Sequence, residues 1–438
     1  MPDLLDDLRR YGDAVESAAI DRQPPDYLAV AAPTPRRPRR LALAGVAVAL
    51  AALAVAVAVA RDDQSNDVRV DTPPTPVETQ IDTPVSPTSL PTEQLPPLTA
   101  ATEIAASDAS WEPRDPGPLA QRWWPAVVWT GDRMIVWGGA GDATGDAAPE
   151  LDDGASYDPA ADMWTPLPSA PVSARAMPVV AWTGMEMLIW GGGGGNTDWT
   201  ARADGAAYDP EGQTWRMLPP APLPAGPLYS GAWTGAELVV VGESADGLLS
   251  ASYDPVADSW RRLATVAIGS PSPGSLLDVS WAGSRVVVLA SLPLGDPTEV
   301  VVYDPATEEW SSSSPQGFGS RSVSTAVLHE KVHIASYSQD TDGTAAFDPA
   351  TGTWTGPVSI SVDLSCEGGS RLVAMADDLF ATGCGRSGIY DPKSATWQPV
   401  ASPQVGEPQS AIWTGSELLW WGAGYSESSP LGLWALRP

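Results

Sequence analysis

The chain has 438 residues, of which 43% are hydrophobic, and a formal net charge of −30. This length exceeds one ordinary domain, so it predicts either two domains or one large closed architecture with tails. The acidic surface repels phosphate backbones and argues against nucleic acid as a partner. Twenty Trp against three Phe indicate that an internal repeat uses one Trp position many times.

Residues 1–40 are expected to form a cytoplasmic tail with one short helix. Leu4, Leu8, Tyr11 and Val15 recur at helical spacing behind Asp3, which is a preferred N-cap residue. A helix of this length is marginal in isolation. It is therefore either solvated or docks on a cytoplasmic partner.

Residues 41–60 are twenty consecutive apolar residues without a charge, the length that spans a bilayer at roughly 1.5 Å per residue. Four Arg lie within residues 36–40, whereas two Asp directly follow Arg61. The positive-inside bias places the N-terminus in the cytoplasm and the rest of the chain outside. We interpret the segment as an uncleaved single-pass anchor; a signal-peptidase site at residues 58–60 and a twin-arginine signal are the alternatives.

Residues 61–107 are expected to form an extracytoplasmic linker. From residue 62 onward this segment contains eight Pro, eight Thr and no aromatic residue. Such a composition cannot bury a core and favours extended polyproline II. The segment is either a stalk that holds the following domain away from the bilayer or a plain disordered linker.

A short phrase recurs six times in residues 108–438: an aromatic residue, Asp-Pro, and a Trp seven positions after the aromatic. The aromatic ends one strand, Asp-Pro begins a turn and Trp enters the return strand. A second phrase, Trp-Thr-Gly, precedes most copies and marks a tight turn before a strand buried on both faces. The aromatic–Trp pairs are Tyr157–Trp164, Tyr208–Trp215, Tyr253–Trp260, Tyr303–Trp310, Phe347–Trp354 and Tyr390–Trp397.

The spacing of these Trp residues gives the number of units. They recur every 43 to 51 positions, and the C-terminus carries the strands of one more unit without its fourth strand. Trp111, in the segment SWEPR, lies 53 positions before Trp164 and predicts that an N-terminal strand completes that unit. The sequence thus predicts an all-β propeller of seven four-stranded blades, in which closure removes the exposed edges of an open sheet.

The repeat resembles the kelch motif, in which a hydrophobic strand ends in Gly-Gly and is followed by Tyr, six residues and Trp. The glycines are Gly138 and Gly139 in the first unit and residues 191–195 in the second. Other units have a single glycine at this position. Residues 108–438 are therefore similar to a divergent kelch array. The resemblance implies a seven-bladed kelch-like β-propeller, but the range of activities in the family leaves the function open.

The connections of such a propeller lie on two opposite sides of the disc. The turns between strands one and two and between strands three and four are short here; the other connections are long and rich in Gly, Pro, Trp and Arg. We expect binding on the side with the long loops, which in kelch-like propellers generally contacts partners. Packing is the competing interpretation for each residue. The candidate ligand-binding residues are Arg122, Trp123, Arg175, Trp199, Arg202, Tyr229, Arg321 and Tyr425.

No metal or other cofactor is predicted. His329 to His333 spell the zincin signature HExxH, which requires a helix so that both His face the zinc. Here these residues align with the turn and second strand of a hairpin, so we interpret the match as chance. They contain the only two His, so the chain cannot supply a copper site like that of galactose oxidase, a kelch-propeller enzyme.

The two Cys and the acidic loops give weaker indications. Cys366 and Cys384 are expected to form a disulfide outside the cell, with two buried free thiols as the alternative. The Asp-rich stretches within residues 142–153 and 340–342 lack the regular alternation and terminal Glu of a calcium loop.

These features predict a membrane-anchored extracytoplasmic binding module, not an enzyme, that recognises a protein or glycan of the cell envelope. One alternative is a hydrolase or lyase acting on a polysaccharide with loop carboxylates as acid and base, although the sequence marks out no such pair. The other is an envelope sensor that signals to the cytoplasmic tail.

Overall fold

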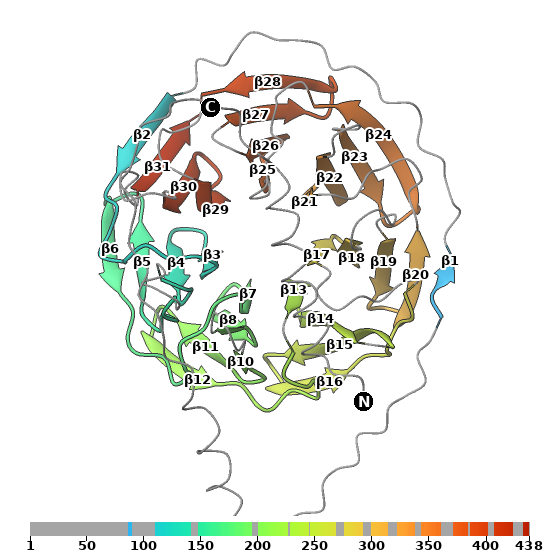
Figure 1. Ribbon diagram of the computed structural model, residues 1–438, viewed down its shortest axis with the longest axis horizontal. Helices are drawn as coiled ribbons and strands as arrows, with labels where there is room; N and C mark the ends of the chain where they lie inside the picture. Colours follow the sequence, from blue (N-terminus) through green and yellow to red (C-terminus); the bar gives the residue numbers. More distant parts are fainter. Residues whose placement is uncertain are drawn as a thin grey trace, which may run out of the picture. The chain divides into compact units, whose positions relative to one another are not determined.

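The protein is described by a computed structural model over residues 86–89, 110–141, 148–194, 200–226, 228–244, 246–268, 276–291, 299–313, 322–337, 343–360, 371–383, 386–401, 407–423 and 432–437. Seven four-stranded antiparallel sheets stand around a central axis as blades (Figure 1). The predicted all-β, seven-bladed propeller is confirmed. The expected N-terminal helix and the apolar segment 41–60 lie outside the described residues, among which no helix is long and apolar enough to cross a membrane.

The first four blades follow the chain in order, from the innermost strand to the outermost. Blade 1 consists of β3 (Ala126–Trp129), β4 (Met134–Trp137), β5 (Gly154–Asp158) and β6 (Met163–Pro166). Blade 2 consists of β7 (Val179–Trp182), β8 (Met187–Trp190), β11 (Gly205–Asp209) and β12 (Thr214–Met217). Blade 3 consists of β13 (Tyr229–Trp233), β14 (Leu238–Ser244), β15 (Gly247–Asp254) and β16 (Ser259–Arg262). Blade 4 consists of β17 (Leu276–Ala282), β18 (Arg285–Ser291), β19 (Glu299–Asp304) and β20 (Glu309–Ser313).

The last three blades complete the ring. Blade 5 consists of β21 (Ser322–Leu328), β22 (Lys331–Tyr337), β23 (Gly343–Asp348) and β24 (Thr353–Ser359). Blade 6 consists of β25 (Arg371–Met375), β26 (Asp378–Gly383), β27 (Arg386–Asp391) and β28 (Thr396–Val400). Blade 7 consists of β29 (Glu407–Trp413), β30 (Leu418–Ala423), β31 (Gly432–Arg437) and β2 (Ser110–Arg114).

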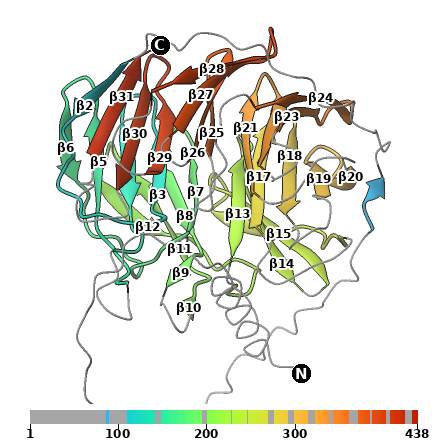
Figure 2. The same cartoon turned by 45° about the horizontal axis from the view of Figure 1, so that its top comes forward.

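Two short pairings lie outside the regular blades. A small hairpin of β9 (Gly193–Gly194) and β10 (Thr200–Ala201) extends from blade 2 on one side of the ring (Figure 2). In the segment expected to be an unstructured linker, β1 (Thr88–Ser89) pairs in parallel with β20. The outermost strand of a blade has unpaired backbone groups, which is why it can accept this extra strand.

The hydrophobic core lies between the blades. The described buried side chains form seven clusters, and each cluster joins two neighbouring blades. In the cluster between blades 4 and 5, for example, Val287 of β18 is grouped with Val332 and Phe347. The central strands are therefore apolar on both faces, as the sequence predicts.

The two recurring phrases have structural roles. In four blades the Thr hydroxyl of Trp-Thr-Gly accepts a hydrogen bond, 2.9 to 3.1 Å long, from the backbone N–H three residues later. The following Gly has a φ of 93° to 108°, which other residues rarely adopt. The six aromatic–Trp pairs face each other across the outer hairpins, with ring centroids 4.8 to 5.1 Å apart. Both phrases belong to the scaffold.

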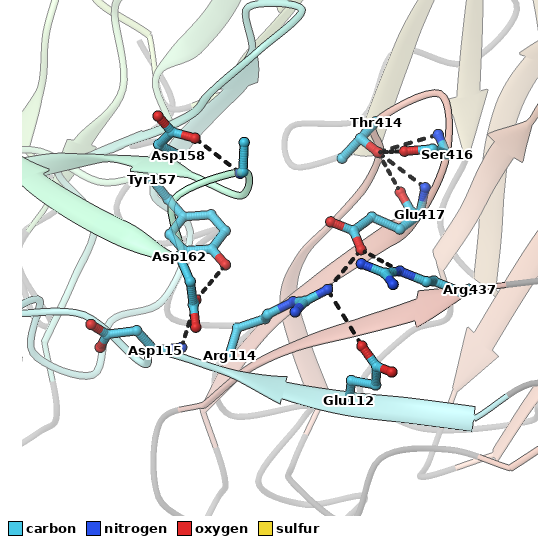
Figure 3. Close-up of polar contacts among 11 residues, drawn as sticks. Glu112, Arg114, Asp115, Tyr157, Asp158, Asp162, Thr414, Ser416, Glu417 and Arg437 are labelled. Carbon is cyan, nitrogen blue, oxygen red and sulfur yellow. Dashed lines mark hydrogen bonds and ion pairs between the residues drawn. The ribbon is translucent and has the colours of Figure 1, made fainter.

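The N-terminal strand closes the ring as predicted. β2 runs antiparallel to β31, with Trp111 opposite Leu436. The buried carboxylate of Glu417 accepts hydrogen bonds from Arg114 at 2.9 Å and from Arg437 at 3.1 Å (Figure 3). Burial alone would lower the pKa of Arg114, but Glu417 reverses the direction and raises it. A charged network thus fixes the closing strand in blade 7.

The residue after this strand joins blade 7 to blade 1. The carboxylate of Asp162 accepts hydrogen bonds from the Asp115 N–H at 3.1 Å and from the Tyr157 hydroxyl at 2.8 Å (Figure 3). These two bonds lower the pKa of Asp162. The Trp164 indole N–H donates to the Asp115 carbonyl oxygen at 2.8 Å. The closure therefore extends beyond its own sheet.

Candidate functional site

The long connections of blades 1 and 2 lie on one side of the disc, which we call the loop side. They join β4 to β5 and β8 to β11, and the second includes the β9–β10 hairpin (Figure 2). The opposite side, which we call the turn side, carries the Thr-Gly and Asp-Pro turns. Five of the eight predicted site residues are described, and they fall on or beside the loops of blades 1 to 3.

Arg122 precedes β3, and its side chain is completely buried. Its guanidinium donates to the carbonyl oxygens of Ala120 at 3.0 Å and Gly138 at 3.1 Å. It also binds both carboxylate oxygens of Asp153, at 2.9 and 3.1 Å. Gly138 and Asp153 lie at the two ends of the loop between β4 and β5, so Arg122 fixes the base of that loop.

Arg175 has the same role in blade 2. It is also completely buried, and it donates to the carbonyl oxygens of Ser173, Gly191 and Asp204, each at 3.0 Å. Its guanidinium forms an ion pair with the Asp204 carboxylate at 3.0 Å. Each of the two Arg reaches the Gly that lies 16 positions later in the chain.

These observations change the interpretation of both Arg. They were expected to face a ligand on the surface, but the structure buries them and uses their N–H groups within the protein. A buried charge is stable only when it is paired and hydrogen-bonded, and the loop ends supply those partners. A direct ligand contact through either side chain would require its loop to open.

Arg202 connects the two loop bases. Its guanidinium lies 2.7 Å from the carboxylate of Glu150 in blade 1 and 3.1 Å from the carbonyl oxygen of Ala174. The Gly139 N–H donates to the Arg175 carbonyl oxygen at 2.9 Å. A Cβ on Gly138 would lie 2.9 Å from that oxygen, so the Gly-Gly pair permits the close approach of the next loop. The loop bases of blades 1 and 2 are thus one hydrogen-bonded unit.

The aromatic residues beside this unit differ in exposure. Trp123 is half-buried and forms a backbone bridge with Ala140. Its neighbour Trp124, which the sequence analysis did not select, is 49% exposed and has a left-handed φ of 54°. The Tyr229 ring lies edge-on to Trp190 at 5.0 Å, and burial raises the pKa of its hydroxyl to about 12. Tyr229 therefore has a packing role, and Trp124 is the side chain presented to solvent.

The remaining predicted residues lie outside the described part of the chain: Trp199, Arg321, Tyr425, Cys366 and Cys384. Ligand contact by any of the eight candidates stays a prediction. Glu150, Asp153 and Asp204 are the partners of the arginines, and the sequence patterns did not indicate this pairing. The shared Arg-to-Gly spacing of 16 positions in blades 1 and 2 is the signal that could have found this arrangement.

The HExxH segment forms a hairpin, as expected. His329 and Glu330 make the turn between β21 and β22 with φ values of 51° and 61°, and His333 lies opposite Ala346 within the sheet. The helical geometry of a zincin is therefore absent from this segment. Across the described residues, no group of three or more His, Cys, Asp or Glu side chains is placed to hold a metal ion.

The turn side contains two hollows that the sequence analysis did not predict. A groove of about 940 Å³ crosses blades 1 to 3, and its lining includes Trp182, Met185 and Trp233. A cavity of about 540 Å³ lies between blades 5 and 6. Both volumes fall within the range of small-molecule sites.

Comparisons with known proteins agree with this architecture. No protein-family model matches the chain. Kelch repeat and BTB domain-containing protein 13 of Homo sapiens is 30% identical over 168 residues, which cover 36% of this chain and 35% of that protein. Kelch-like protein 35 of Mus musculus is 25% identical over 154 residues, or 33% of this chain and 25% of that protein. This propeller is kelch-like. The matched segments span about a third and a quarter of the lengths of these relatives.

Proposed function

We propose that this chain is a membrane-anchored, extracytoplasmic binding module whose kelch-like propeller recognises a protein or glycan of the cell envelope on its loop side. The observation that carries the proposal is the rigid base beneath the long loops of blades 1 and 2. Arg122, Arg175 and Arg202 hold the ends of these loops through buried or half-buried ion pairs.

A rigid loop base favours binding for a physical reason. Ordering a loop on association costs conformational entropy, and a loop whose ends are already fixed loses less of it. The exposed Trp124 lies directly beside this base, and its carbonyl oxygen accepts a hydrogen bond from the Met177 N–H at 3.0 Å. Trp is among the residue types that contribute most to protein interfaces.

Replacing Trp124 with Asn is expected to weaken binding of the envelope partner at least about fivefold, because truncation of an interface Trp typically costs about 1 kcal/mol or more. Asn tolerates the left-handed backbone at this position. The partner would be captured from envelope extracts on the immobilised full chain, and its Kd would then be measured for both proteins. Met185→Ala, at an exposed residue on the turn side, is the matched control. Loss of binding in the control with none in Trp124→Asn would refute the choice of side.

The location in the membrane rests on residues 41–60 and on the charges that flank them. In cells expressing the full chain with a C-terminal tag, the protein is expected in the membrane fraction, and protease added outside is expected to remove the tag. Deletion of residues 41–60 should release the chain from the membrane. A tag that only detergent makes accessible to protease would place the propeller on the other side.

A further inference from the structure

The cavity between blades 5 and 6 contains a buried His at a position that is apolar in every other blade. This position follows the second-strand residue that pairs with the aromatic of the repeat phrase, and in the other blades it packs against the next blade. In blade 5 it is His333, which is only 6% exposed. In the other blades it is Ile135, Leu188, Val239, Val287, Phe380 and Leu419. Packing alone therefore does not explain the imidazole.

A second polar group in this cavity is the hydroxyl of Tyr390, which lacks the Asp partner found in two other blades. The Tyr157 and Tyr253 hydroxyls donate to an Asp five residues later, at 2.8 and 2.6 Å. Tyr390 has Ala395 at that position, as Tyr208 has Gln213 and Tyr303 has Glu308. The hydroxyl of Thr344, which is 2% exposed, has no hydrogen-bond partner among the described residues.

These groups line one cavity. His333, Tyr390 and Thr344 all border the 540 Å³ space, as does Ala395. Buried polar side chains are nearly always hydrogen-bonded, because an unpaired one costs about 1–3 kcal/mol. The unpaired Thr344 hydroxyl, with His333 and Tyr390 around the same small-molecule-sized space, indicates a ligand that supplies its partner.

Basic side chains also line this cavity. Lys331 and Lys393 are the only two Lys in a protein with 54 acidic residues, and both line it together with His329. Asp377 is the single carboxylate of the lining; it pairs with Lys393 at 2.5 Å and with His329 at 3.0 Å. Among the described residues, the nearest carboxylate oxygen to Lys331 is 4.0 Å away, in Asp348. Lys331 is therefore the cation best placed to receive an anion.

We propose that this cavity binds a small hydroxylated organic carboxylate, with its carboxylate at Lys331 and Lys393 and its hydroxyl groups at His333, Tyr390 and Thr344. A monoanion suits a site with two ammonium groups and one carboxylate. Hydroxyl groups suit the interior, because each can donate and accept.

The protonation states of the interior groups fit this ligand. Burial, then Lys331 and His329, lower the pKa of His333 to about 4, so the imidazole is neutral at pH 7 and has one donor and one acceptor nitrogen. Burial and the neighbouring Asp391 raise the pKa of Tyr390 to about 12, so its hydroxyl remains a donor.

The test is titration of the full chain with D-gluconate and D-glucuronate, followed by calorimetry and ligand-observed NMR, with neutral D-glucose as the comparison. We expect saturable binding of at least one acid below about 10 mM and at least tenfold weaker binding of glucose. Tyr390→Phe and His333→Val should each weaken the acid about fivefold to tenfold. Both use residues that the chain itself has at these repeat positions, Phe347 and Val287, so the fold should tolerate them.

Lys331→Met should weaken binding as well, whereas Arg133→Met, which removes a cation at the equivalent position of blade 1, should leave it unchanged. The absence of saturable binding by both acids would overturn the proposal. So would an unchanged affinity in both Tyr390→Phe and His333→Val. If His333→Val does not fold, Tyr390→Phe decides alone, because it removes a single oxygen atom.

Discussion

Replacing Arg122 with Met is expected to lower the free energy of unfolding by about 3–4 kcal/mol, because the change leaves buried acceptors without their donor. The guanidinium is fully buried and supplies hydrogen bonds to the carbonyl oxygens of Ala120, Gly138 and Asp153. The Asp153 carboxylate is 56% exposed and can turn to water, so we attribute most of the loss to the carbonyl groups.

Urea unfolding followed by Trp fluorescence measures this change. Arg133→Met is the matched control, since Arg133 is 43% exposed and its two carboxylate contacts are 3.6 and 3.8 Å long. Exposed ion pairs of this kind contribute about 0–1 kcal/mol. A similar small loss in both variants would contradict the role assigned to Arg122 and, by analogy, to Arg175.

The stability of the wild-type chain is expected to fall by about 3 kcal/mol more than that of His333→Val between pH 7 and pH 4. The pKa of His333 is lowered from about 6.5 to about 4, first by burial and then by Lys331 and His329, while Lys393 and Asp377 line the same cavity. Between these values the unfolded state binds a proton that the folded state excludes. The contribution of His333 is therefore complete above pH 6.5 and is lost as the pH approaches 4.

The relevant measurement is the difference in unfolding free energy between the two proteins at several pH values, because other acidic groups affect both equally. Chemical denaturation at pH 7, 6, 5 and 4.5 covers the window. Parallel pH profiles for the wild type and His333→Val would show that the imidazole is accessible to protons in the folded state.

The fold follows from local patterns in the sequence, and the loop site does not. The aromatic–Trp spacing and Thr-Gly phrases each describe one hairpin, so a single sequence is enough to count the blades and to place Trp111 in the last one. The burial of Arg122 depends on Gly138 and Asp153, which lie far away in the chain. An Arg in a variable loop is ordinarily solvated, and only the repetition of the Arg-to-Gly spacing at Arg175 signals otherwise.

The unusual residues of the cavity between blades 5 and 6 can be recognised in the sequence, but only by aligning the equivalent strands of all seven blades. The HExxH pattern is typical of a zinc site, and its place in a hairpin excludes that role without giving His333 another. Alignment of the seven strands shows His333 alone among apolar residues. The same alignment shows Ala395 where Tyr157 and Tyr253 have an Asp five positions later. That both changes face one space is known only from the packing of two blades.

The closing strand also determines the order in which the molecule can be assembled. β2 is among the first propeller residues to be synthesised, yet its partner β31 is the last, since residue 110 pairs with residue 437. Such non-local contacts form late and slowly. Until then β31 and β2 each expose an unpaired edge, which is the form most open to pairing with another chain. Since Glu417 is buried against Arg114 of β2 and Arg437 of β31, arrival of the C-terminus completes the charged network and the ring in one step.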